Sequence, residues 1–234
     1  MTPAIRASRL TKRFGQTMVL DDIALEVQPG ECLGVTGTNG AGRTTLLRIL
    51  ATLSPPSSGR LEIAGIDAVR RVMDARAHVM YVGPDLLPGD GLLVREYLDI
   101  VRAARPHTVG APLTVPDVVA RAGLPGDAPI RTLSSGFRQR LALAAGILAG
   151  TPVLLLDDPL RGLDQGAKTE CLGWLREIRD GGTAMVATFY DADDEALLCH
   201  RLVHMGDGRA SHQAGRDGAE AMRLPPRAVV AGDG

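Results

Sequence analysis

The feature that most constrains the fold of this chain is a glycine-rich loop at residues 37–45, which reads GTNGAGRTT. The pattern Gly, four residues, Gly, Lys, then Ser or Thr is typical of phosphate-binding loops. Gly37, Gly42 and Thr44 meet this pattern, and Arg43 stands where it has Lys. The substitution falls on the most charged position, so it bears on whether a bound nucleotide is hydrolysed or only held.

The segments on either side of the loop favour this interpretation. Residues 31–36 form a short, mostly apolar run typical of a buried strand, and residues 46–53 carry Leu and Ile at helical spacing. A strand, a glycine loop and a helix in this order let backbone N–H groups and the helix N-terminus point at one anion. We expect the hydroxyl of Thr44 to bind Mg²⁺. Taken alone, the loop could also be an ordinary turn.

The composition limits the classes of function. The chain has 234 residues, enough for one large domain, and a formal net charge of -1, so no overall positive field attracts nucleic acid. Aromatic residues at 3% argue against stacking surfaces for single strands. Cys32, Cys171 and Cys199 lack paired spacing, which is typical of free thiols in a reducing cytosol. We expect neither a signal peptide nor a membrane-spanning helix.

The order of predicted elements indicates an α/β fold with an antiparallel β start. Strands are predicted in the first part of the chain at residues 5–14, 18–27, 32–36, 60–64 and 78–83. Residues 92–123 then follow a helical pattern with a break at 106–116. Later elements are a helix at 136–148, a strand at 153–156, a helix at 165–179, a strand at 183–188 and a helix at 192–199. Residues 201–205 are predicted as a last edge strand.

Two further motifs follow the loop. Residues 153–158 read VLLLDD, an apolar strand that ends in Asp157 and Asp158, and a carboxylate placed there suits a Mg²⁺ site. Residues 133–140 read LSSGFRQR, a serine-rich cap before an apolar helix whose N–H groups could hold an anion. Each motif alone has a plain alternative, namely a strand that ends in a polar turn and an ordinary capped helix.

Together, and in this order, the motifs make the chain resemble the nucleotide-binding subunit of an ATP-binding cassette (ABC) transporter over about residues 4–206. The resemblance implies a P-loop NTPase core with an N-terminal antiparallel β subdomain and a small α-helical subdomain at about 88–140. We therefore expect one ATP-binding domain at residues 1–206 and a partly disordered tail rich in Gly, Ala and Pro at 207–234.

The resemblance also implies ligands and partners. ATP and Mg²⁺ are the expected ligands. The expected partners are a second nucleotide-binding domain and a transmembrane subunit on a separate chain, with no nucleic acid. The expected location is the cytoplasm, at the inner face of the cell membrane.

The resemblance assigns roles to individual residues. Phe14 matches the aromatic residue that stacks on adenine, Asp157 matches an aspartate that helps hold Mg²⁺, and Asp164 matches the D-loop at the dimer interface. The ATP-binding loop comprises Gly37, Thr38, Asn39, Gly40, Ala41, Gly42, Arg43, Thr44 and Thr45. The signature that would face the nucleotide of a partner comprises Leu133, Ser134, Ser135 and Gly136, with Ser135 in place of a glycine.

Two departures from the family pattern change the charged groups at the phosphates. Arg43 replaces a Lys that slots between the β and γ phosphates, and a planar guanidinium places its charge differently from a compact ammonium. Asp158 replaces the Glu that polarises water. Loss of one methylene retracts a carboxylate by roughly 1.5 Å, and a misplacement of about 1 Å can lower a rate on the order of 10²-fold.

Two more departures concern the switch segments. Tyr190 stands in the slot of the family's switch His, with Phe189 as the alternative. Pro84 stands where the family has the Gln of the Q-loop. Asp85, which follows it, is a further candidate Mg²⁺ ligand beside Thr44 and Asp157.

The surviving backbone features are those that binding needs, and the changed residues are those that chemistry needs. We therefore predict Mg-ATP binding with slow hydrolysis at the chain's own site, where Asp158 and Tyr190 hold the catalytic positions. Homodimer and heterodimer remain equally open, and the heterodimer would pair one competent site with one degenerate site. Export is favoured over import because no long C-terminal regulatory domain follows the cassette.

Other functions remain open. The main alternative is a non-hydrolysing regulatory or interaction module that uses ATP to dimerise. A soluble cassette ATPase of repair or translation ranks lower. Cys199, His200 and His204 are close in sequence, but a strand is expected there rather than a metal site.

Overall fold

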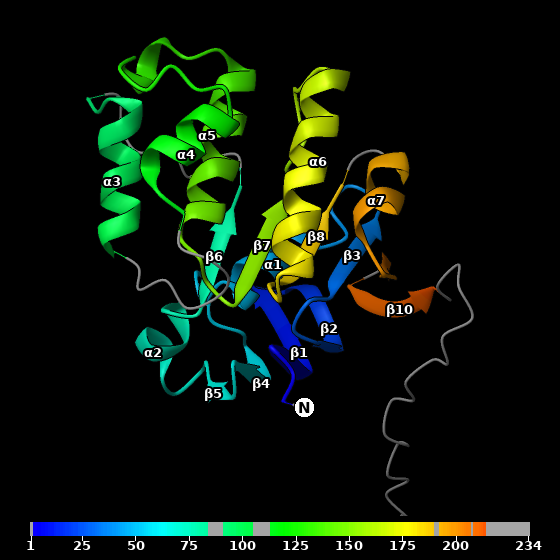
Figure 1. The fold of residues 1–234 in the computed structure, drawn as a ribbon. Coiled ribbons are helices and arrows are strands. Elements are labelled where there is room, and N and C mark those ends of the chain that lie inside the picture. Colours follow the sequence, from blue (N-terminus) through cyan, green and yellow to red (C-terminus); the bar gives the residue numbers. More distant parts are fainter. Residues whose placement is uncertain (1, 84–90, 105–112, 190–191, 207, 214–234) are drawn as a thin grey trace, which may run out of the picture.

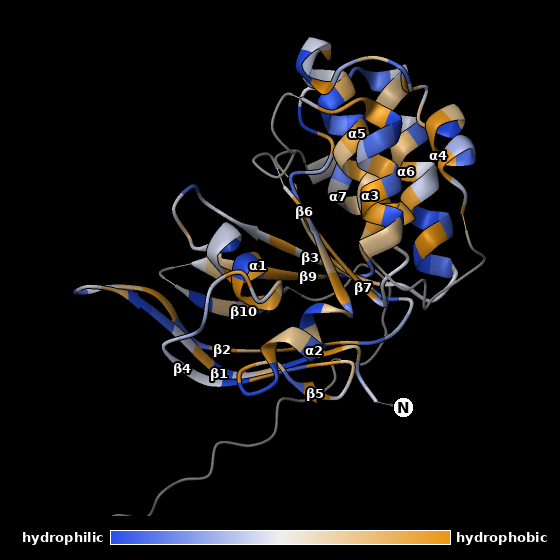
Figure 2. Ribbon diagram, turned by 90° about the vertical axis from the view of Figure 1, so that its left-hand side faces the viewer, coloured by the Kyte–Doolittle hydropathy of each residue, from blue (hydrophilic) through white to orange (hydrophobic). Residues whose placement is uncertain are grey.

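The computed structural model describes residues 2–83, 91–104, 113–189, 192–206 and 208–213. These residues form layers: a first sheet, a helix, a second sheet and a group of helices (Figure 1). Turned by 90°, the molecule shows α1 (Arg43–Leu50) between the two sheets and the other large helices beyond the second sheet (Figure 2). The architecture is the predicted α/β fold.

The first sheet is antiparallel and has the strand order β2-β1-β4-β5. Its strands are β1 (Ile5–Phe14), β2 (Thr17–Val27), β4 (Ser58–Ile63) and β5 (Ile66–Asp67). Buried residues tend to alternate along β1 and β2, because one face of the sheet packs on α1 and the other faces outward. This sheet confirms the predicted antiparallel β start.

The second sheet has the order β10-β9-β3-β8-β7-β6. Its strands are β3 (Cys32–Gly37), β6 (Val79–Val82), β7 (Val153–Asp157), β8 (Ala184–Thr188), β9 (Arg201–Gly206) and β10 (Arg209–Gln213). The pairs from β9 to β6 are parallel, and β10 is antiparallel to β9. The parallel strands therefore end at one edge of the sheet, where their C-terminal residues meet.

The position of β9 corrects one expectation. Residues 201–205 were expected to form the last edge strand, but β10 pairs along the outer side of β9, so β9 is an interior strand. The order of strands in space, which the linear pattern does not carry, explains the error. Strand β10 also lies beyond residue 206, the expected limit of the domain. The rest of the tail, residues 214–234, lies outside the described residues.

The short helix α2 (Val72–Arg76) lies near the first sheet. The other helices cover the far face of the second sheet. They are α3 (Val94–Ala104), α4 (Val115–Arg121), η1 (Ile130–Thr132), α5 (Ser135–Leu148), α6 (Gln165–Asp180) and α7 (Ala192–Leu198). Of these, α3, α4 and η1 fall within residues 88–140. Within the described ranges, no helix is both long and apolar enough to cross a membrane.

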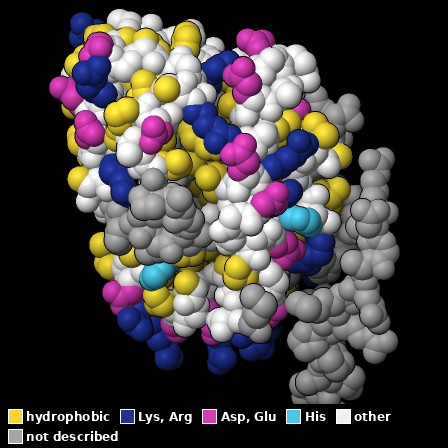
Figure 3. Space-filling model, viewed as in Figure 1, with side chains coloured by type: hydrophobic (Ala, Val, Ile, Leu, Met, Phe, Trp, Pro, Cys, Tyr) yellow, Lys and Arg dark blue, Asp and Glu magenta, His cyan; other side chains and the backbone are white. Residues whose placement is uncertain are grey.

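Two apolar cores meet at the second sheet. Along β7, Val153 and Leu155 pack on the α1 side, whereas Leu154 and Leu156 pack on the side of α5 and α6. This period of two places every apolar side chain of the strand in a core, as expected for a parallel sheet covered on both faces. At the surface, acidic and basic side chains are interspersed over the face seen in Figure 3, so this face has no uniformly basic region.

The packing of β7 yields a first prediction. Leu155 is fully buried on the α1 side of the second sheet, so Leu155→Ala is expected to lower the free energy of unfolding by about 2–5 kcal/mol. Leu197→Ala is the matched control, because this leucine is 50% exposed and its loss is expected to cost less than about 0.5 kcal/mol. Urea unfolding followed by the fluorescence of Trp174 measures both, and equal losses would contradict this account of the core.

Candidate functional site

A cavity of about 710 Å³ lies at the C-terminal ends of β7 and β8 and at the start of α1. It brings together the glycine loop and the two carboxylates that end β7, as the sequence predicts. The residues that line it are Asn39, Arg43, Thr44, Arg48, Asp157, Asp158, Leu160, Arg161, Gly162, Lys168, Thr188, Phe189 and Asp194.

The glycines of the loop are required by its backbone. Gly42 has a φ of 92°, and a Cβ added there would lie 2.8 Å from the carbonyl oxygen of Val19 on β2. A Cβ on Gly37 would collide with the carbonyl oxygen of Met205 on β9. Gly42 precedes α1 and gives it no side-chain cap, so the first N–H groups of the helix are left for an anion.

Arg43 lies at the first position of α1 and is half-buried. Its Nη1 donates a hydrogen bond to the main-chain oxygen of Phe189, at 3.3 Å. The guanidinium therefore links the loop to the residue that follows β8. The length and the planar head of arginine allow this contact while the side chain still lines the cavity.

Asp157 is a buried carboxylate with both oxygens engaged. Oδ2 accepts a hydrogen bond from the hydroxyl of Tyr81 on β6, and Oδ1 accepts one from the hydroxyl of Thr188 on β8, each at 2.9 Å. Only 8% of the residue is exposed. Burial, together with the negative charge of Asp157, raises the pKa of Tyr81 well above its usual range, so the phenol stays protonated and keeps donating.

Asp158 sits beside Asp157 in an uncommon conformation. Its φ is 53°, in the left-handed region that Asp tolerates better than most residues. Its N–H lies 3.1 Å from both the carbonyl and the hydroxyl oxygen of Thr188. These contacts fix the backbone at the turn where the second carboxylate enters the cavity.

Lys168 and Asp194 form an ion pair at the wall of the cavity. The ammonium of Lys168 on α6 lies 2.6 Å from a carboxylate oxygen of Asp194 on α7, and their side chains are 20% and 9% exposed. No pattern in the sequence pointed to this pair, or to Tyr81 and Thr188. The partners are 26 residues apart or more, and no local spacing connects them.

The signature and the D-loop come together at a second, smaller pocket of about 220 Å³. Ser134 caps α5 by accepting a hydrogen bond from the Phe137 N–H at 3.3 Å, and Asp164 caps α6 by accepting one from the Ala167 N–H at 2.9 Å. Ser134, Gly136 and Asp164 line this pocket. None of the signature residues lines the larger cavity, so the signature and the glycine loop face different pockets.

The remaining predicted residues divide into two groups. Phe14 is 55% exposed, does not line the cavity, and has the Lys12 ammonium 4.9 Å from its ring centroid. Phe189 packs its ring into the core while its carbonyl accepts from Arg43. Pro84, Asp85 and Tyr190 lie outside the described residues.

Comparison with known proteins decides the family. The family described as "ABC transporter" matches residues 20–161, which include the glycine loop, the signature and the carboxylates. The chain belongs to the ABC transporter family. Within it, the chain is a nucleotide-binding subunit with a P-loop NTPase fold, so the ATP-binding and transport roles of the family apply to it.

The relatives of this ABC subunit agree with the assignment. It is 34% identical to the "Nod factor export ATP-binding protein I" of Paraburkholderia xenovorans over 88% of this chain and 69% of that protein. It is 33% identical to the "Daunorubicin resistance ATP-binding protein DrrA3" of Streptomyces coeruleorubidus over 93% of this chain and 70% of that protein.

Solved structures share the fold of this ABC subunit. An "ATP binding subunit of ABC transporter" superposes with a TM-score of 0.83 at 21% identity, covering 92% of this chain and 91% of the other. The "ATP-binding cassette MJ0796 bound to ADP and Pi", described as dimeric, gives a TM-score of 0.82 at 20% identity over 92% of this chain and 100% of the other.

The network around Asp157 yields a second prediction. Tyr81→Phe removes one donor to a buried carboxylate and is expected to lower the free energy of unfolding at pH 7 by about 1.5–3 kcal/mol. Because the pKa of Tyr81 is raised in the folded state, its contribution is present below the ordinary value of 10 and is lost as the pH rises above it.

The difference between wild type and Tyr81→Phe should therefore shrink above about pH 10, measured by urea unfolding over a pH series. Tyr97→Phe is the control, because the Tyr97 hydroxyl makes no hydrogen bond to the described part of the chain. A loss at pH 7 as large for Tyr97→Phe as for Tyr81→Phe would contradict the role given to the Tyr81 hydroxyl.

Proposed function

We propose that this ATP-binding subunit holds Mg-ATP in the larger cavity and hydrolyses it slowly at its own site. The observation that carries the proposal is the hydrogen bond from Arg43 to the Phe189 carbonyl, at the edge of a cavity that also contains the glycine loop and Asp157. The Arg43 guanidinium, which is the cation at the phosphate position, is thus partly engaged in a hydrogen bond within the protein.

The residues present fit Mg-ATP. The uncapped start of α1 and the curled glycine backbone provide N–H donors for phosphate oxygens, and the Thr44 hydroxyl and the Asp157 carboxylate provide oxygen ligands of the kind that Mg²⁺ prefers. When bound, Mg²⁺ neutralises charge on the phosphates. The exposed ring of Phe14, on the β1–β2 hairpin, offers a surface for adenine.

Slow hydrolysis follows from two side chains. Asp158 is one methylene shorter than Glu, so its carboxylate stops short of the place from which a water would be oriented. Arg43 has to leave the Phe189 carbonyl, or share its guanidinium with it, before it can neutralise phosphate charge. Both effects act on the rate more than on affinity, because the backbone donors of the loop are unchanged.

The smaller pocket supports a dimer. Ser134 and Gly136 of the signature lie together with Asp164 at this pocket, which contains no residue of the chain's own loop, so they are free to serve the nucleotide of a second domain. The dimeric state named for MJ0796 agrees with such an arrangement. We propose that the second domain belongs to a different chain with intact motifs, so that one site of the pair is competent and one is slow.

The names of the relatives favour export. Proteins named for Nod factor export and daunorubicin resistance are about a third identical to this chain over the aligned residues. We propose that the subunit energises an exporter from the inner face of the cell membrane, through a transmembrane subunit on a separate chain.

Turnover of the purified chain tests slow hydrolysis. Wild type is expected to bind ATP, by equilibrium dialysis, and to turn it over well below once per second. The double variant Arg43→Lys, Asp158→Glu is expected to gain on the order of 10-fold to 100-fold in kcat, because both groups then reach their targets. Arg161→Lys, a change of the same kind at an exposed residue of the same cavity, is the control.

Two outcomes would overturn the proposal. Wild type alone turning over ATP several times per second would show that the departures do not limit the rate. An equal gain for Arg161→Lys would show that the effect is not specific to position 43.

Purification of the complex from membranes tests the pairing. The expected result is this chain together with a transmembrane chain and a second, different cassette chain. In that complex Ser135→Arg should reduce turnover at least 10-fold, because it blocks the signature given to the competent site, whereas Arg43→Ala should reduce it less than 2-fold. Two identical cassette chains, with equal losses for both variants, would establish the homodimer instead.

A further inference from the structure

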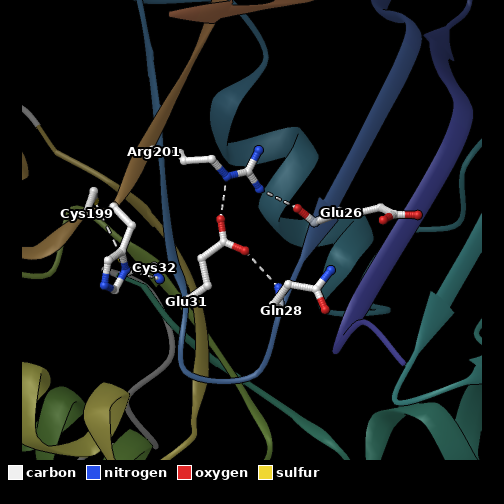
Figure 4. A network of polar contacts seen from close by, with 7 residues as sticks. Glu26, Gln28, Glu31, Cys32, Cys199 and Arg201 are labelled. Carbon is white, nitrogen blue, oxygen red and sulfur yellow. Dashed lines mark hydrogen bonds and ion pairs between the residues drawn. The ribbon is translucent and has the colours of Figure 1, made fainter. Parts of the chain in front are cut away.

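Two cysteines that are far apart in sequence lie side by side at the start of β3. Cys32 is the first residue of β3 and Cys199 directly follows α7, and their sulfur atoms are 3.6 Å apart (Figure 4). They are separated by 167 positions, so the spacing in the sequence gave no indication of a pair. Cys171, the third cysteine, lies on α6 in a different environment.

Hydrogen bonds between Cys32 and His200 hold the two cysteines in place. The N–H of His200 donates to the carbonyl oxygen of Cys32 at 2.9 Å, and the N–H of Cys32 donates to Nδ1 of His200 at 3.1 Å. His200, the residue next to Cys199, therefore makes two hydrogen bonds with Cys32. Burial lowers the pKa of His200, which favours the neutral ring that this acceptor role needs.

An ionic network fixes the same place from the other side. The Glu31 carboxylate lies 2.5 Å from the Arg201 guanidinium and also accepts the Gln28 N–H at 2.8 Å, while Arg201 donates to the Glu26 carbonyl at 2.7 Å (Figure 4). Glu31 precedes Cys32 and Arg201 lies two residues after Cys199. The backbones that carry the two sulfurs are thus tied together on both sides, and the sulfurs have little freedom to separate.

The two thiols differ in access. Cys32 is fully buried, whereas Cys199 is half-buried and therefore within reach of a small oxidant. The hydrogen bond to Cys199, together with burial, raises the pKa of Cys32, so this buried thiol keeps its proton. Greater access gives Cys199 the part of the attacking thiol, and burial gives Cys32 the part of the resolving thiol.

We propose that Cys32 and Cys199 are a thiol–disulfide modification site that hydrogen peroxide oxidises. The Cys199 thiol gives up its proton and its sulfur attacks one peroxide oxygen; the O–O bond breaks, and the leaving hydroxide takes that proton, so sulfenic acid and one water form. Cys32 then loses its proton and attacks the Cys199 sulfur, which forms the S–S bond and displaces the hydroxyl as a second water. Two thiols are oxidised and one peroxide is reduced, and a dithiol reductant reverses the bond.

The position of the site defines its effect on the structure. β3 runs from Cys32 to the glycine loop, and α7 contributes Asp194 to the cavity wall. The disulfide would join the start of that strand to the end of that helix, about 17 Å of extended strand away from the loop. It therefore leaves the phosphate site open and restrains α7 relative to β3.

Mass spectrometry of the native full-length chain tests the site. The chain is treated with hydrogen peroxide, quenched, alkylated with iodoacetamide and digested. The expected product is a cross-linked peptide pair containing Cys32 and Cys199, lighter by two hydrogen atoms and cleaved by dithiothreitol. Cys171→Ser is the matched control and should give the same product, whereas Cys32→Ser and Cys199→Ser should not.

The outcomes that overturn the proposal are equally definite. The proposal is overturned if, after peroxide treatment, all three cysteines can still be alkylated under denaturing conditions. It is also overturned by sulfinic acid at Cys199 without a cross-link, or by a disulfide between two chains. A second readout uses no variant: the oxidised chain should unfold at higher urea than the reduced chain, because the bond closes a long loop of the unfolded state. Identical midpoints in a cross-linked sample would overturn the proposal that the folded chain accommodates this bond.

Discussion

The larger cavity depends on one buried carboxylate and the two hydroxyls that hold it. Removing a carboxylate from water costs several kcal/mol unless its oxygens accept hydrogen bonds, and Asp157 receives one from Tyr81 and one from Thr188. Because these donors come from β6 and β8, the contacts join the ends of three neighbouring strands. The polar floor of the cavity is therefore a property of the strand order, and the glycine loop and α1 are packed against it.

The sequence predicts this arrangement only in part. Local patterns identified the glycine loop, most strands and the two carboxylates, because periodicity and spacing act within a few residues. Tyr81 and Lys168 escaped notice because their partners belong to other elements, and no local pattern says which strand or helix will be the neighbour. β10 was missed for the same reason, since pairing with β9 rather than an apolar run of its own makes it a strand.

The structure also changes how the departure at position 43 is understood. Lysine occurs in this chain only at positions 12 and 168, and arginine fills every other basic position. Each lysine makes a short contact in a confined place, Lys12 to the Pro55 carbonyl at 2.7 Å and Lys168 to Asp194 at 2.6 Å. Arg43 instead spans from α1 to the end of β8, a distance that suits a long side chain with a forked head.

The Arg43 guanidinium has two competing acceptors, the Phe189 carbonyl and a phosphate group. A phosphate group that takes Arg43 removes a donor from the carbonyl that follows β8, and a conformation that tightens this hydrogen bond weakens the hold on phosphate. The two equilibria are thermodynamically linked, so each must change the other by the same factor. In this chain, occupancy of the glycine loop and the position of the Phe189 carbonyl are thus coupled through a single side chain.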